Sequence, residues 1–315
     1  PLMNPDGRDR FLQMLAEHRA ANPNVDSQSL LHGGYWPWGR TNHYMFDLNR
    51  DWIFGVHPET RGRIQAVRRW RPQLFLDAHE MESHDTFLFS PPRAPWAAFG
   101  GAIGILFEQA RIAEDGVLRH EGTIEPYRLS VRKQATASLA LVRTVAANKA
   151  DIMRAYADER AAASKGEGFT SAEAWAIPAG GDEARVRRLI DTLRLQGVEV
   201  ERAGRAFRGA GVDRFGRDVE DRAFAEGTFI VRRAQPDGHL AAALLDFDPR
   251  MDREFLEKER REILRFDRSL LYDTTSWNLP MMFDVETVAL GAAPPAGERV
   301  TGWPDVAREA LDRTT

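Results

Sequence analysis

Residues that can bind carboxylates, ligate metals and transfer protons follow one another in the first third of this chain of 315 residues. They lie in four short sequences: Asn4-Pro5-Asp6-Gly7, Asp47-Leu48-Asn49-Arg50-Asp51-Trp52, Leu76-Asp77-Ala78-His79-Glu80-Met81 and Ile105-Leu106-Phe107-Glu108-Gln109. Each sequence is a weak indication by itself, because short motifs recur by chance. Their order supplies an arginine for a carboxylate, a histidine for a metal and a glutamate for a proton.

His79 is the residue most suited to bind a metal. It follows residues 72–78, a predicted buried strand, and open α/β sheets place their ligands at the carboxyl ends of strands. A ring nitrogen of histidine binds zinc, and Asp77 or Glu80 can hold the second nitrogen. A histidine in this position is more often structural, so His79 by itself does not establish a metal site.

Arg50 and its neighbour Asn49 can hold a carboxylate. A guanidinium forms two parallel hydrogen bonds with the planar carboxylate at the end of a peptide, and Asn49 adds a donor. The alternative is a surface arginine that pairs with Asp47 or Asp51. The context of the pair has to decide between the two interpretations.

Glu108 and Arg40 are two further candidates. Glu108 ends an apolar strand and can take a proton from metal-bound water, although a glutamate at a strand end commonly points to solvent. Arg40 can support negative charge on a carbonyl oxygen, or it is an ordinary loop arginine. Asn4-Pro5-Asp6-Gly7 has the composition of a turn and is not expected to take part in chemistry. It is informative only because it precedes the other three sequences in the chain.

Hydrophobic periodicity predicts the elements that position these residues. Residues 1–70 are predicted to be rich in loops, and three short strands follow at residues 72–78, 86–90 and 102–108. The last strand is apolar on both faces, as at the centre of a covered sheet. Apolar residues then recur at helical spacing over residues 129–162, which predicts one long helix with at most one break.

A second α/β domain is predicted after a linker at residues 164–168. It begins with a strand, a helix and a strand, in the order of a βαβ unit. Its predicted elements are strands at residues 174–178, 198–202 and 227–231 and helices at residues 183–196 and 252–268. The tail after residue 290 is predicted to be loosely ordered up to a short terminal helix.

Taken together and in order, the four sequences resemble the zinc carboxypeptidase family, the relatives of carboxypeptidases A, B and T. The resemblance implies that His79 is the third zinc ligand and that Glu108 is the general base. It also implies that Arg40 polarises the scissile carbonyl. In the same way, Asn49 and Arg50 are implied to grip the terminal carboxylate of the substrate.

The resemblance also implies a domain organisation. It is greatest to bacterial members of the family, which often carry a C-terminal domain like class I glutamine amidotransferases. The expected fold class is therefore α/β, with part of a carboxypeptidase-like catalytic domain, a mixed sheet with helices, at residues 1–163. A smaller amidotransferase-like α/β domain is expected at residues 164–290, and a tail at residues 291–315. Because the chain has no cysteine, the second domain lacks the nucleophile of a working amidotransferase.

Two departures from the family pattern predict an impaired site. The first two zinc ligands of the family come from a His-x-x-Glu motif upstream of Asn4, and the sequence has none there. The only such motif runs from His79 to Glu82 and overlaps the third ligand, whereas catalytic zinc needs three protein ligands. The connection from His79 to Glu108 is also short and has no tyrosine. Both departures are typical of a fragment or a decayed gene product.

The composition excludes several classes of function. A net charge of −4 argues against a nucleic-acid-binding protein, which would carry a basic excess. Without cysteine, the chain can form neither a disulfide nor a thiolate metal site. No transmembrane helix is predicted, because no apolar stretch is long enough. The sequence does not determine the compartment, although resemblance to exported relatives favours the periplasm or the medium.

The predicted function is hydrolysis of the last peptide bond of a peptide by zinc-activated water, impaired in this chain. The predicted substrate is a peptide or small amide with a free carboxylate. One alternative is an amidase or deacylase of the same superfamily, which needs the same metal centre. Another is a non-catalytic module that binds free C-terminal carboxylates. The preferred terminal residue, the oligomeric state and the role of the second domain do not follow from the sequence.

Overall fold

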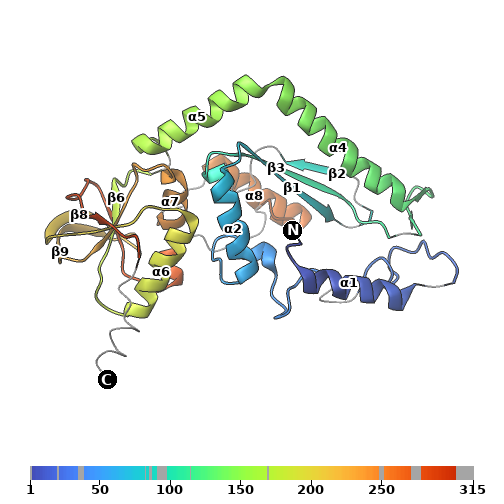
Figure 1. The fold of residues 1–315 in the computed structure, drawn as a ribbon, viewed down its shortest axis with the longest axis horizontal. Helices are drawn as coiled ribbons and strands as arrows, with labels where there is room; N and C mark the ends of the chain where they lie inside the picture. Colours follow the sequence, from blue (N-terminus) through green and yellow to red (C-terminus); the bar gives the residue numbers. More distant parts are fainter. Residues whose placement is uncertain are drawn as a thin grey trace. The chain divides into compact units, whose positions relative to one another are not determined.

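The computed structural model describes residues 2–19, 21–34, 39–81, 83–84, 87–90, 98–113, 115–168, 170–247, 252–270 and 278–302. The chain forms two compact units, Pro1–Arg160 and Ala161–Thr315, called unit 1 and unit 2 below. Both combine helices with sheets, so the predicted α/β class is confirmed (Figure 1). The predicted domain boundary at residues 163–164 lies close to the division between the units.

Unit 1 contains a three-stranded sheet, a small hairpin and several helices. Its elements are α1 (Pro5–His18), η1 (Leu48–Arg50), α2 (Pro58–Trp70), β1 (Leu74–Met81), β2 (Phe87–Ser90), β3 (Ile103–Ala110), β4 (Val117–Leu118), β5 (Ile124–Glu125), α4 (Tyr127–Ala147) and α5 (Lys149–Lys165), which continues into unit 2. The three predicted strands correspond to β1, β2 and β3. His79 lies inside β1 rather than after it, because pairing with β3 continues to Met81.

The prediction that residues 1–70 are rich in loops is wrong for two segments, because α1 and α2 are helices. Asn4 is the N-cap of α1, and its side chain accepts a hydrogen bond from the backbone nitrogen of Gly7 at 3.0 Å. Pro5 occupies the first turn, where a missing N–H costs nothing. Asn-Pro-Asp-Gly is therefore a helix start and not a turn.

The sheet of unit 1 has the strand order β1-β3-β2. β3 runs parallel to β1 and antiparallel to β2, so β3 is the central strand, as its apolar sequence predicted. Most residues of β3 are buried, whereas β1 has no buried residue and lies at the edge. Strand order therefore leaves the strand that carries His79 with only one neighbour in the described part of the chain.

The long helix predicted for residues 129–162 is confirmed and has one break, at Asn148 between α4 and α5. Its apolar residues do not face a core, however: Leu139 is 58% and Val142 is 64% exposed. The predicted linker at residues 164–168 is partly wrong, because Ser164 and Lys165 belong to α5. Helical spacing thus predicted the helix, but it did not predict that the apolar residues of the helix are exposed.

Unit 2 is built around a seven-stranded sheet with the order β12-β7-β10-β6-β11-β8-β9. Its strands are β6 (Ala174–Ile177), β7 (Glu201–Arg202), β8 (Phe207–Asp213), β9 (Asp218–Phe224), β10 (Phe229–Arg232), β11 (Val288–Leu290) and β12 (Glu298–Arg299). Its helices are α6 (Glu183–Gln196), α7 (Gly238–Leu245), α8 (Arg253–Phe266) and α9 (Leu279–Met282). All neighbouring strands pair antiparallel.

The predicted strand–helix–strand unit exists as β6, α6 and β7, but its strands are not neighbours. β10 lies between them and pairs antiparallel with both, so β6 and β7 run parallel to each other. The strand predicted for residues 198–202 is shorter than expected and comprises only Glu201–Arg202. Asp182 caps α6 by accepting hydrogen bonds from the backbone nitrogens of Ala184 and Arg185 at 3.0 and 3.1 Å.

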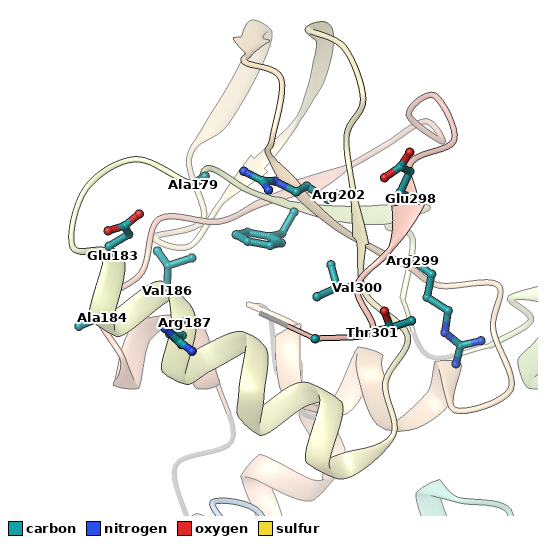
Figure 2. A pocket seen from close by; sticks show the side chains of 12 residues that line it. Ala179, Glu183, Ala184, Val186, Arg187, Arg202, Glu298, Arg299, Val300 and Thr301 are labelled. Carbon is teal, nitrogen blue, oxygen red and sulfur yellow. The ribbon is translucent and has the colours of Figure 1, made fainter. Parts of the chain in front are cut away.

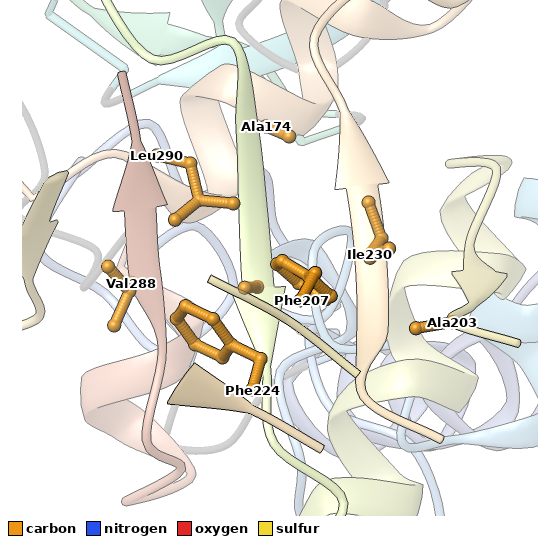
Figure 3. Close-up of a cluster of buried hydrophobic side chains, with 8 residues drawn as sticks. Ala174, Ala203, Phe207, Phe224, Ile230, Val288 and Leu290 are labelled. Atoms are coloured by element: carbon orange, nitrogen blue, oxygen red, sulfur yellow. The ribbon is translucent and has the colours of Figure 1, made fainter. Parts of the chain in front are cut away.

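The core of unit 2 lies on both faces of β6, whose four residues are all buried. On one face, Phe207 and Phe224 stack with ring centroids 4.9 Å apart over residues from β6, β10 and β11 (Figure 3). On the other face, Trp175 and Ile177 are fully buried, as are apolar residues of α6 such as Leu189. Burial on both faces explains why β6 reads as a continuous apolar run.

The tail predicted to be loosely ordered contains β12, which pairs with β7. The predicted terminal helix and the sequence Tyr272 to Trp277 lie outside the described residues. Within the part of the chain that the structure describes, no helix is long and apolar enough to cross a membrane.

Candidate functional site

His79 and Glu108 lie next to each other because β1 and β3 pair in parallel with these two residues opposite each other. Opposed residues on parallel strands point to the same face, and Asp77 shares that face because it lies two residues from His79. The Nε2 atom of His79 lies 3.0 Å from Oδ1 of Asp77, and the two side chains are 24% and 36% exposed. Asp77, named from the sequence as one possible partner of His79, therefore holds its ring.

The electrostatic environment of His79 includes two predicted site residues. The hydrogen bond to Asp77 raises the pKa of His79 above its ordinary value of 6.5, and partial burial opposes this rise. The charge of Glu108 raises the pKa further, whereas the charge of Arg40 lowers it. Both groups are thus close enough to influence the imidazole, which links the sheet edge to the loop that carries Arg40.

Asp47 organises the loop that carries Arg40, Asn49 and Arg50. Its Oδ2 atom accepts a hydrogen bond from Nε of Arg40 at 2.7 Å. Its Oδ1 atom accepts one from the backbone nitrogen of Asn49 at 2.8 Å, which caps η1. One carboxylate therefore positions the predicted oxyanion-stabilising residue and the predicted carboxylate clamp together.

Asn4 holds the same loop from the start of α1. While its Oδ1 atom caps the helix, its Nδ2 atom donates to the backbone oxygens of Arg40 and Thr41 at 3.4 and 3.2 Å. Arg10, six residues further along the chain, in α1, donates to the backbone oxygen of Thr41 at 3.1 Å. Hydrogen bonds thus join the start of α1 to the segment that carries Arg40, although 35 or more residues separate Asn4 from it.

Two buried polar residues fix the remainder of this loop. Asn42 is fully buried and accepts hydrogen bonds from the backbone nitrogens of Tyr44 and Phe46 at 3.0 and 3.1 Å. Asp51 is also fully buried, and its two carboxylate oxygens accept from the backbone nitrogens of Val56 and His57, both at 2.9 Å. The Asp51 carboxylate is therefore used to hold backbone.

Arg50 lies at the end of η1 and is exposed at the surface. Helix α2 secures η1, because Arg63 donates to the backbone oxygen of Leu48 at 2.9 Å and lies over the ring of Trp52 at 4.5 Å. Gln134 of α4 donates to the backbone oxygen of His79 at 3.0 Å and holds that strand. The sequence did not indicate Arg63 or Gln134 as positioning residues, because both lie outside the four motifs and no local pattern relates them to η1 or β1.

A zinc ion would need more ligands than this arrangement supplies. Among the described residues, no group of three or more histidine, aspartate or glutamate side chains is placed to hold a metal ion. His79 is one nitrogen ligand, Asp77 already binds its Nε2 atom, and Glu80 points to the opposite face of β1. By themselves, these residues do not fit the three-ligand zinc site that the resemblance implies.

Comparisons with protein-family models, with curated proteins and with solved structures found no match to this chain.

Proposed function

We propose that unit 1 is a carboxypeptidase-like domain that binds peptides by their free C-terminal carboxylate and belongs to a metallocarboxypeptidase-type hydrolase. The observation that carries the proposal is that His79 and Glu108 lie opposite each other on β1 and β3, with Arg40, from a distant segment, near enough for its charge to act on His79. A purely structural arrangement would not require an acid, an imidazole and a guanidinium from distant segments to meet.

In this proposal each residue has a distinct role. The guanidinium of Arg50 pairs with the substrate carboxylate, and Asn49 adds a donor. Arg40, which Asp47 orients, stabilises negative charge that develops on the carbonyl oxygen. Glu108 accepts a proton beside that carbonyl. In the family that the sequence resembles, zinc activates the attacking water, but the described residues provide only one histidine for it.

Binding can be tested separately from hydrolysis. Fluorescence anisotropy with a labelled peptide is expected to show binding that weakens about tenfold or more when the C-terminus is amidated, because one charge-assisted contact is lost. Arg50→Ala is expected to lower affinity for the free peptide to that of the amide. Arg8→Ala is the matched control, because Arg8 lies on α1 and, among the described residues, its side chain pairs with the exposed Asp9 alone. Equal binding of both peptides would contradict the proposal.

Hydrolysis needs a second experiment. We expect less than one zinc ion per chain after dialysis and little or no release of the terminal amino acid, because the residues that the structure describes do not assemble three ligands. Stoichiometric zinc with peptidase activity that Glu108→Gln abolishes would instead establish a complete enzyme.

The absence of a three-ligand group among the described residues specifically favours one alternative, a module that binds free C-termini without cleaving them. Peptide binding that zinc neither strengthens nor converts to hydrolysis would support this alternative. For unit 2, the likeness to class I glutamine amidotransferases stays a prediction.

A further inference from the structure

Unit 2 has a half-open pocket of about 840 Å³ between α6 and the segment that contains β12 (Figure 2). Its apolar lining includes Val186 from α6, Phe229 from β10 and Val300. Arg202, Glu183 and Glu298 are among its charged residues. Pockets of this volume hold small organic ligands in many proteins.

The wall opposite α6 is fixed in place by hydrogen bonds. The backbone nitrogen of Gly297 donates to Glu201 at 2.9 Å, and that of Val300 donates to the backbone oxygen of Val200 at 2.8 Å. Arg194 of α6 donates to the backbone oxygen of Thr301 at 2.7 Å. The pocket is therefore formed before any ligand binds, which lowers the entropic cost of binding.

A row of three side chains crosses one side of the pocket. Glu298, Arg202 and Phe229 are opposite one another on the neighbouring strands β12, β7 and β10. They share one face of the sheet, and Phe229 is only 5% exposed. A guanidinium thus lies between a carboxylate and a buried aromatic ring.

Three charged side chains of the pocket, two from this row and Glu183 from α6, are available to a ligand. Within the described residues, the side chains of Arg202, Glu183 and Glu298 form neither an ion pair nor a hydrogen bond, although Arg202 and Glu298 are opposed in the sheet. Arg299, by contrast, pairs with Glu199 at 2.8 Å. Figure 2 shows the Arg202 guanidinium between Glu183, on the α6 side, and Glu298, on the β12 side.

We propose that this pocket binds a zwitterionic ligand of dipeptide size with an apolar side chain. Arg202 would pair with the ligand carboxylate, and Glu298 or Glu183 with its ammonium group. The apolar side chain would lie on Phe229 and Val186. Two unpaired carboxylates disfavour phosphates and other polyanions. The N-terminus of α6 is not an anion site either, because Asp182 already binds its backbone nitrogens.

Isothermal titration calorimetry of the full chain with the dipeptide leucyl-phenylalanine tests this proposal. The titration is made in an Arg50→Ala background, so that binding at the carboxylate clamp proposed for unit 1 cannot contribute. We expect Arg202→Met to weaken binding about tenfold or more. Arg202→Lys should weaken it less, because lysine keeps the positive charge but cannot form two parallel hydrogen bonds with a carboxylate. Arg205→Met is the matched control, because Arg205 is exposed nearby and does not line the pocket.

Two derivatives of the probe test the zwitterion. N-acetyl-leucyl-phenylalanine and leucyl-phenylalaninamide are each expected to bind about tenfold or more weakly, because each loses one charged contact. Glu298→Gln and Glu183→Gln identify the partner of the ammonium group. No measurable binding of the dipeptide, equal binding by the Arg202→Met chain, or equal binding of either derivative would overturn the proposal. None of these outcomes depends on whether unit 1 binds peptides.

Discussion

At the scale of single residues, one carboxylate to which the sequence assigned no role in the site organises the loop of the candidate site. Asp47 accepts hydrogen bonds from the side chain of Arg40 and from the backbone of Asn49. The sequence interpretation considered Asp47 only as a surface partner of Arg50. Because a charge-assisted pair and a helix cap share this residue, its loss should disturb both proposed substrate contacts.

Replacement of Asp47 can therefore separate its two contacts. Asp47→Ala should weaken the binding of a peptide with a free C-terminus about tenfold, because Arg40 and η1 both lose their anchor. Asp47→Asn should weaken it less, because its amide oxygen can still cap η1. Asp9→Ala is the control, since within the described part of the chain the side chain of Asp9 forms a single exposed pair, with Arg8. Anisotropy titrations check this, and unchanged affinity in the Asp47→Ala chain would rule out the organising role.

At the scale of elements, strand pairing explains which parts of the site could be predicted. The order of two apolar strands, each with a polar residue near its end, made the meeting of His79 and Glu108 predictable. The helix α6 was predicted with its observed bounds, because Asp182 and Gly197 mark its ends and a buried apolar stripe runs between them.

Other elements could not be predicted, for identifiable physical reasons. α1 has only Gly7 and Met14 buried and α2 only Thr60 and Ile64, so neither shows a strong apolar stripe. The hairpin of β8 and β9 was missed because its strands expose many charged residues. The contacts that hold α1 lie 31 or more residues away in the sequence, so local patterns do not report them, whereas the hairpin pairs locally and its composition hides it.

The N-cap of α1 gives a prediction at this scale. Asn4→Ala should lower the free energy of unfolding by about 1–2 kcal/mol, because the cap and the hydrogen bonds to the loop are both lost. Asn4→Asp should cost less, because a carboxylate still caps the helix but cannot donate to Thr41. Denaturant unfolding measures both changes. Identical losses for the two variants would show that the cap contributes nothing, and an Asn4→Asp chain as stable as the unchanged chain would show the same of the loop contacts.

The edge position of β1 gives a second prediction. Gln73 and Met81 accept backbone hydrogen bonds from the β3 side, so alternate residues between them face β3. The amides of Leu76 and Ala78 point the other way and have no partner among the described residues. Hydrogen exchange followed by NMR should therefore be faster for Leu76 and Ala78 than for Asp77 and His79. Equal protection would show that another strand covers this edge.

At the scale of the whole molecule, the two units differ in how their apolar residues are used. Unit 2 buries both faces of β6, whereas Leu139 and Val142 of α4 in unit 1 are exposed. The apolar pattern was equally clear in both regions of the sequence. A pattern can predict that a face is apolar, but only the neighbouring segments decide whether that face becomes a core.

The pH dependence of stability is a prediction for unit 2 as a whole. Burial opposes ionisation of Glu201, but hydrogen bonds from Arg232 and from the backbone of Gly297 outweigh it and lower the pKa of Glu201 below 4.5. Ionised Glu201 therefore stabilises the fold fully above pH 4.5, and this contribution is lost as the pH falls through the lowered pKa.

Glu201→Gln tests this sign. At pH 7 the substitution should cost about 1–2 kcal/mol, reduced from the value for a fully buried pair because Glu201 and Arg232 are each 23% exposed. The difference from the unchanged chain should shrink in acid, as the carboxylate becomes protonated. Urea unfolding at several pH values measures it, with Glu220→Gln as an exposed control. A cost that stays constant into acid would contradict the assignment.

The open side of β1 also has a practical consequence for work with the protein. Among the described residues, the peptide groups of Leu74, Leu76 and Ala78 on the open side of β1 have no partner, so a strand of another polypeptide can pair with them. Concentrated samples should therefore self-associate and lose solubility during storage. A lysine in place of Leu76 would place a charge on that strand and extend the useful life of the preparation.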